Sequence, residues 1–366
     1  MKIRLLTSET SPAKECLLGL AYEGKNPDLG DVLQAAVKVA KKTGDLDTSD
    51  RATSVFYPAG KGLPIRIGFV GAGKRKDVTA DKLRRAAAVA QKLASSHKVK
   101  AFRLVVHEDD HKGMDAGVVG RAVAEGIILG AYQYKKPSGT KAPTQHANSA
   151  EIFYTGADVK GFRAGVQTGR IGAEATVFAR DIENFSGNKA TPRYLASQAR
   201  KFKSPGLSVR IMEESEMRKH GMAALLGVSR GSREPAKMIL MDYKPKGYKS
   251  TVCVVGKGLT FDTGGISINP SANMGDMRYD MCGGGAVLGL FHAIANGGMK
   301  GANGKVRVVG IVPSSENMPD GDAQKPGDVV AACDGTTIEI INTDAEGRLI
   351  LADALAYAKK TYKPDR

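Results

Sequence analysis

The segment TVCVVGKGLTFDTGGISI, residues 251–268, carries the clearest fold signal in the chain. It begins with Thr251–Val255, an apolar run rich in β-branched residues that we expect to be a strand buried on both faces. Val306–Val312 is a second such run, and Gly283–Asn296 between them has the apolar spacing of a helix. A strand, a helix and a strand in this order predict a βαβ unit.

The rest of the chain extends this α/β pattern. Strands and helices alternate in the first half, which predicts a mostly parallel sheet, and the polar segment 135–146 predicts a loop. We expect strands at 64–70, 101–106, 151–154 and 336–341, and helices at 31–42, 79–94, 114–131, 159–182 and 347–360.

Length and composition limit the class of protein. A chain of 366 residues with 42% hydrophobic and 25% charged residues suggests two globular domains and argues against disorder. No apolar run approaches the ~18 residues that a membrane span requires, and the N-terminus lacks the apolar core of a secretion signal. The 4 cysteines show no CxxC spacing. We therefore expect free thiols and a cytoplasmic location, without a membrane partner.

Positive charge is concentrated in the first part of the chain. The formal net charge is +16, and residues 1–150 hold 25 Lys and Arg against 15 Asp and Glu. Such a region could bind DNA or another polyanion by neutralising phosphates. A solvated, lysine-rich surface is the simpler explanation, because no aromatic residues interleave with the charges.

Two motifs in the first half of the chain resemble the sequence patterns of known binding sites, but neither meets all the requirements of its site. The stretch Gly68–Arg75 has phosphate-loop spacing, but Arg75 stands where Ser or Thr must hold magnesium. The string His107–His111 matches the zinc-protease pattern, but it directly follows an expected strand and so lacks the helix that would align its histidines. We interpret the first as a strand-to-loop turn and the second as an acidic surface loop.

Acidic residues follow the expected buried strands of the second half, where open α/β sheets place their ligands. Four of them form the candidate set: Asp262 and Asp280 in the segment 255–285, and Asp344 and Glu346 in the segment 342–349. Since Asp344 and Glu346 are two residues apart, an extended backbone would point both carboxylates the same way. Any one of these acids could be an ordinary loop residue. As a set in one cleft they would repel each other and require a cation.

Divalent ions with oxygen ligands fit such a set, and two ions ~3.5–4 Å apart are the usual hydrolytic arrangement. Lys257 lies in the same segment. Its ammonium would repel a metal, but a neighbouring dication can lower the pKa of the amine until the neutral form is itself a ligand.

These segments resemble the leucyl aminopeptidase family of cytosolic two-metal enzymes. Asn342–Leu349 is similar to that family's signature octapeptide, and Gly256–Ile268 to its other metal segment. The resemblance is strong from about residue 160 onward and loose before it. Further matching motifs are 179–184, Gly187-Asn188, Thr191-Pro192, Gly221-Met222 and Glu316–Pro319.

The resemblance implies two domains. Residues 1–160 would form a basic, macro-domain-like α/β domain with a regulatory or assembly role. Residues 161–366 would form an α/β catalytic domain with a central mixed sheet, incomplete here. It also implies peptide substrates, removal of a leucine-like N-terminal residue, and a homo-hexamer.

The resemblance also assigns roles to individual residues. Asp262 and Glu346 would share two metal ions, Asp344 would complete one site, and Lys257 with Asp280 the other. Manganese or zinc, and also magnesium, suit these ligands, and a metal-bridging hydroxide would attack the peptide carbonyl. Arg348 would be a catalytic residue that holds bicarbonate as a proton shuttle.

Two features depart from the family pattern. Asn269 occupies a catalytic position that is usually Lys, and losing one group that stabilises an oxyanion costs about 10²–10³ in rate. Family members also continue beyond the helix that follows the signature, so we expect this chain to be a fragment. The alternative function is a catalytically weakened or inactive relative with a DNA-binding or assembly role.

Overall fold

The computed structural model describes residues 1–8, 13, 15–24, 31–60, 62–111, 113–134, 147–299 and 305–366, with the side chains of 31–33, 35, 36 and 110 left out. The loop expected at 135–146 lies outside these residues. Two compact units, Met1–Glu174 and Ala175–Arg366, are described separately. The predicted roles of residues 1–160 and 161–366 stay predictions. No helix among the described residues is both long and apolar enough to cross a membrane.

The first unit is built on a six-stranded sheet with the order β1-β6-β5-β2-β4-β3. Every neighbouring pair is parallel except β3 with β4, which confirms the predicted mostly parallel sheet. The strands are β1 (Lys2–Leu6), β2 (Cys16–Ala21), β3 (Thr53–Phe56), β4 (Arg66–Gly71), β5 (Ala101–Val106) and β6 (Ser149–Tyr154). The helices are α1 (Asp31–Thr43), α2 (Ala80–Ser96), α3 (Ala116–Gly130) and the first part of α4 (Val159–Glu183).

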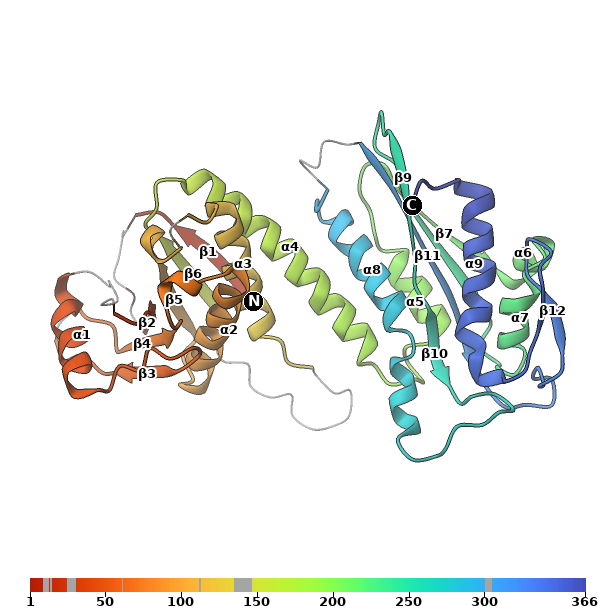
Figure 1. Ribbon diagram of the computed structural model, residues 1–366, viewed down its shortest axis with the longest axis horizontal. Coiled ribbons are helices and arrows are strands. Elements are labelled where there is room, and N and C mark those ends of the chain that lie inside the picture. The colour runs from red at the N-terminus through yellow and green to blue at the C-terminus, as the bar shows by residue number, and fades with distance from the viewer. Residues whose placement is uncertain are drawn as a thin grey trace. The chain divides into compact units, whose positions relative to one another are not determined.

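Side chains of this sheet alternate between two hydrophobic cores, because successive strand residues point to opposite faces. Leu18 and Leu104 pack with α2 and α3, whereas Leu17 and Val105 pack on the other face with Val37 of α1. The unit therefore has three layers, with helices on both faces of the sheet (Figure 1).

The two motifs set aside from the sequence both lie where a strand of this sheet passes into a loop, as expected. The stretch Gly68–Arg75 continues β4 into a 3₁₀ turn, Arg75–Asp77, and α2 starts only at Ala80. The string His107–His111 follows β5 and forms the 3₁₀ turn Glu108–His111. The zinc-protease string therefore lacks the α-helix that would align its two histidines.

The second unit contains a mixed sheet, which the family resemblance implied. β11 (Val306–Asn317) is parallel to both β9 (Ser250–Val255) and β10 (Gly258–Asp262), and antiparallel to β8 (Lys237–Tyr243). β8 in turn pairs antiparallel with β7 (Leu207–Glu213). The order β9, α8 (Cys282–Ala295), β11 confirms the predicted βαβ unit.

Helices cover both faces of this sheet (Figure 1). α5 (Pro192–Ala199) and α8 pack on one face through Leu195 and Phe291. On the other face, α7 (Ala223–Ser229) and α9 (Glu346–Tyr362) pack through Leu225 and Tyr357, and α6 (Glu214–Lys219) adds Met217.

Two expectations about strands are wrong. β9 is only partly covered, with Thr251 as its one buried residue, because among the described strands it pairs on a single side, with β11. The strand expected at 336–341 is β13 (Thr337–Glu339), which pairs with β12 (Val329–Ala331) in a separate two-stranded sheet. The Asp334-Gly335 turn, with Gly335 at φ +90°, folds β13 onto its predecessor. The acidic segment 342–349 therefore follows no buried strand.

Candidate metal centre

The acidic residues meet at the edge of the second unit's sheet where β10 and β11 end. β9 and β10 lie along the same side of β11, interrupted at Gly256 and Lys257. α8 and α9, which cover opposite faces of the sheet, both begin near this edge. A break in a strand and two helix starts thus bring side chains from distant segments together at the end where α/β sheets bind ligands.

Three carboxylates form the centre of the site. Asp262 is the last residue of β10, Asp280 precedes α8, and Glu346 is the first residue of α9. One oxygen from each lies within 4.8 Å of the others. Asp262 is 5% exposed and Glu346 is 1% exposed. The structure therefore brings together three of the four acids expected in one cleft, and it buries two of them deeply.

Lys257 lies between two of these carboxylates. Its Nζ is 2.6 Å from Asp280 Oδ2 and donates to Glu346 Oε1 at 2.7 Å. Burial alone would lower the pKa of Lys257, but the bonds to Asp280 and Glu346 outweigh it and raise that pKa. Gly347 makes room for the side chain, because a Cβ there would lie 2.8 Å from the Lys257 Nζ. Without a metal the lysine is therefore an ammonium that offsets part of the acidic charge.

Asn317, the last residue of β11, fixes the position of Asp262. Its Nδ2 donates to Asp262 Oδ1 at 2.9 Å and to the carbonyl oxygen of Thr343 at 3.0 Å. Asp262 Oδ1 also accepts from the backbone N–H of Gly264 at 2.8 Å. Our sequence reasoning did not single out Asn317 as a site residue. Its place in the motif Glu316–Pro319 and at the end of an expected buried strand was the available signal.

Thr343 connects the glycine-rich loop to the acidic octapeptide. Its Oγ1 donates to the Gly264 carbonyl at 2.6 Å and accepts from the Ser267 N–H at 2.8 Å. Gly264 has φ +87°, and a Cβ there would lie 2.4 Å from the Ser267 carbonyl oxygen. Only glycine fits this position without a clash, so the loop conformation that aims Asp262 depends on it.

Asp344 lies outside the three-carboxylate cluster, although it is close enough to contribute to the raised pKa of Asp262. Its Oδ1 accepts from Asn269 Nδ2 at 2.6 Å. Thr343–Ala345 is a 3₁₀ turn and Glu346 is helical, so the prediction of an extended backbone here is wrong. Arg348 is exposed on the first turn of α9.

The electrostatics of the cluster favour an additional cation. Burial raises the pKa values of Asp262, Asp280 and Glu346, and neighbouring carboxylates add to the effect in all three. Glu346 Oε2 is buried and has no hydrogen-bond partner among the residues that the structure describes. Since a buried, unpaired carboxylate oxygen is costly, the donor set fits a hard divalent ion.

Comparison with known proteins places the chain in a family. Residues 177–366 match the catalytic domain of the cytosol aminopeptidase family, and residues 18–137 match its N-terminal domain. The chain belongs to the cytosol aminopeptidase family. This confirms the resemblance seen in the acidic octapeptide and the glycine-rich segment.

Among members of the cytosol aminopeptidase family, a protein named "Probable cytosol aminopeptidase" from Azoarcus sp. (strain BH72) is 40% identical over 99% of this chain and 73% of its own length. A protein of the same name from Nitrosococcus oceani is 40% identical, and the chain spans 60% of its length. A solved structure titled "Bottromycin maturation enzyme BotP in complex with Mn" has a TM-score of 0.79 and 32% identity, covering 95% of this chain and 70% of that one.

Proposed function

We propose that the second unit contains the metal centre of an aminopeptidase that removes N-terminal residues from peptides with two divalent cations. The observation that carries this proposal is the buried cluster of Asp262, Asp280 and Glu346 with Lys257 between two of its members. Membership of the cytosol aminopeptidase family supports it. The manganese named for the similar solved structure suggests this ion as the first to test.

The residues that would hold the cations are Lys257, Asp262, Asp280, Asp344 and Glu346. Their donors fit, because the cluster offers carboxylate oxygens that include the unpartnered Glu346 Oε2. Divalent ions bound there would polarise the scissile carbonyl and activate a water for attack. Manganese, zinc and magnesium all accept such ligands.

The chain's own residues prepare the site for this chemistry. Asn317 and Gly264 both donate to Asp262 Oδ1, which fixes the orientation of that carboxylate. Lys257 carries its proton while it is bonded to Asp280 and Glu346. To become a metal ligand it must release that proton, so metal binding at Lys257 is coupled to proton release.

Asn269 supplies a hydrogen-bond donor where the resemblance implies a lysine. Its amide donates to Asp344 at 2.6 Å, so it interacts with a proposed metal ligand but brings no positive charge for an oxyanion. We expect slow turnover on this account. Arg348, exposed on α9, remains the proposed holder of bicarbonate as the proton shuttle.

The leucine-like preference, the homo-hexamer and the cytoplasmic location remain proposals for the whole protein. The alternative role, DNA binding or assembly by a catalytically weakened relative, also stays a prediction. DNA binding would appear as retention on duplex DNA that weakens linearly in log affinity with log salt. Retention that ignores salt would count against it.

The test of this proposal measures both Mn²⁺ binding and peptidase turnover. The full chain is titrated with Mn²⁺ by calorimetry and assayed with leucine p-nitroanilide, alongside Glu346→Gln and a matched control, Asp276→Asn. Asp276 is an exposed acid that is not part of the cluster, with 69% of its side chain accessible. We expect loss of Mn²⁺ binding and turnover in Glu346→Gln and little change in the control. Mn²⁺ binding without turnover would contradict the peptidase function, and equal Mn²⁺ binding in the two variants would contradict the proposed site.

A further inference from the structure

A pocket of about 350 Å³ lies in the first unit, away from the cluster described above. Arg75, Lys76 and Val78 come from the loop between β4 and α2, and His111 and Met114 from the loop between β5 and α3. β4 and β5 are the two neighbours of β2, and all three are parallel. The pocket is thus at the carboxyl edge of a parallel sheet, where such sheets bind ligands, and it has a volume typical of a small-molecule site.

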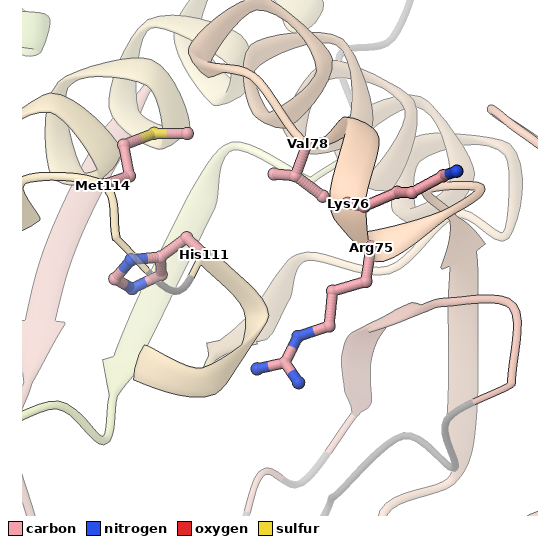
Figure 2. Close-up of a pocket in the computed structure, with 5 residues that line it drawn as sticks. All are labelled: Arg75, Lys76, Val78, His111 and Met114. Atoms are coloured by element: carbon pink, nitrogen blue, oxygen red, sulfur yellow. The ribbon is translucent and has the colours of Figure 1, made fainter.

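Figure 2 shows Arg75, Val78, His111 and Met114 around one space, with the side chain of Lys76 running away from the other four. The stretch Gly68–Arg75, which is not a phosphate loop, and the string His107–His111, which is not a zinc site, therefore contribute Arg75 and His111 to the same pocket. Neither motif supplies the chemistry of its own pattern, but together they supply a guanidinium and an imidazole.

The guanidinium of Arg75 has unused hydrogen-bonding capacity. Its Nε and Nη2 are buried, and neither has a hydrogen-bond partner among the described residues. Asp109 lies 3.8 Å from Nη2 and has 77% of its side chain exposed, so this ion pair is long and solvated. A guanidinium presents its donors in a fork that matches the oxygens of phosphate or carboxylate, and leaving such donors unpaired in a buried position is costly.

The other walls are fixed and partly apolar. His111 is 4% exposed, and its ring stacks on Tyr154 with centroids 6.1 Å apart. Val78 and Met114 provide hydrocarbon surface opposite Arg75 and His111 (Figure 2). A ligand that fits this lining has an anionic group at one end and a non-ionic body at the other.

We propose that this pocket binds a small phosphate monoester, with the phosphate on Arg75 and the rest of the molecule against Val78 and Met114. Phosphate offers more acceptor oxygens and more charge than a carboxylate. This suits an arginine with two buried donors that have no hydrogen-bond partner among the described residues, and a nearby histidine. Lys76 adds positive potential at the rim. The proposal does not depend on the peptidase function, because all of the lining residues belong to the first unit.

The test is calorimetric titration of the full chain with inorganic phosphate, with AMP as a phosphate monoester and with acetate as a carboxylate control. Arg75→Met is compared with Arg85→Met, an exposed arginine on α2 that pairs with Asp81 and does not line the pocket. Circular dichroism melts establish that both variants are folded.

We expect saturable binding of phosphate and AMP, tighter for AMP and absent or much weaker for acetate. Because a hydrogen bond to a charged group is worth about 1.5–3 kcal/mol, Arg75→Met should weaken phosphate and AMP binding by about tenfold or more. Arg85→Met should leave it unchanged. Absence of saturable binding, or equal losses in both variants, would overturn the proposal, since equal losses indicate a diffuse basic surface. Acetate binding as tight as that of phosphate would overturn the assignment to phosphate monoesters.

Discussion

Replacing Asn317 by leucine tests whether Asp262, a proposed metal ligand, is oriented from the end of β11. Asn317 is 2% exposed, and its amide donates at 2.9 Å to a carboxylate and at 3.0 Å to the Thr343 carbonyl. Leucine has a similar volume but no donor. The variant therefore leaves two buried acceptors short of one hydrogen bond each.

The expected effect follows from these two bonds. A hydrogen bond to a charged group contributes about 1.5–3 kcal/mol and one to a neutral carbonyl about 0.5–1.5 kcal/mol, so we expect Asn317→Leu to lower the free energy of unfolding by about 2–4 kcal/mol. Loss of a residue that orients a metal ligand weakens metal affinity by about 10–100-fold. Asn317 also lowers the pKa of Asp262 against the effect of burial. The variant should therefore bind Mn²⁺ only at higher pH than the parent chain.

Urea denaturation measures the stability change, and calorimetric Mn²⁺ titration at several pH values measures the affinity change. Asn296→Leu is the matched control, because Asn296 is exposed and its amide donates to a backbone carbonyl of its own helix. That control should stay within about 0.5 kcal/mol of the parent chain. If Asn317→Leu binds Mn²⁺ as the parent does, with an unchanged pH midpoint, Asn317 does not orient the ligand.

Three further predictions concern other parts of the second unit. Asn269→Lys should raise kcat on leucine p-nitroanilide by about 10²–10³, and an unchanged kcat would show that the missing charge is not the defect. Asp353→Ala should lower the free energy of unfolding by about 2–5 kcal/mol in urea, because the buried carboxylate accepts from the N–H groups of Leu225 and Cys333 at 2.8 Å each. Removal of Mn²⁺ by a chelator should abolish turnover and its return should restore it, and turnover that survives the chelator would contradict metal dependence.

The secondary structure could be predicted where the pattern of apolar residues was long and favoured a single type of element. The helix expected at 159–182 is α4, and the run Val306–Val312 lies within β11. β8, which is central and buried over its first five residues, was not predicted. A short apolar run rich in Met, Leu and Ile fits a buried helix segment as well as a strand, so periodicity alone does not identify it. The pairing of β13 with β12 could not be predicted either, because it depends on the preceding Asp334-Gly335 turn.

The site was predictable in its residue types but not in its geometry. The two segments after expected strands, together with the family resemblance, singled out Lys257, Asp262, Asp280 and Glu346, which the structure brings together. The spacing argument for Asp344 failed, because a 3₁₀ turn and a helix start replace the extended backbone that it assumed. Hydrogen bonds between segments 26 to 79 residues apart set these conformations, and no local pattern encodes them.

The raised pKa values of the cluster lead to a linked dependence on pH and metal. Asp262, Asp280 and Glu346 have higher pKa values in the folded chain than in the unfolded chain, chiefly because they are buried. The folded state therefore holds protons more tightly, and the stability that these groups contribute is present at low pH and is lost as the pH rises through their folded pKa values. As these three carboxyl groups lose their protons, the ammonium of Lys257 compensates only part of their negative charge.

The proposed divalent cation would reverse this trend, because it would bind the same carboxylates in their deprotonated form. The melting temperature of the chain without metal should fall as the pH rises above the ordinary carboxyl range, and the increase in melting temperature on adding Mn²⁺ should grow over the same interval. In Asp276→Asn both trends should persist, since Asp276 is not in the cluster. If Mn²⁺ raised the melting temperature by the same amount across this pH range, the ion would bind elsewhere. Only ligands that lose a proton when the metal binds make the stabilisation by Mn²⁺ depend on pH.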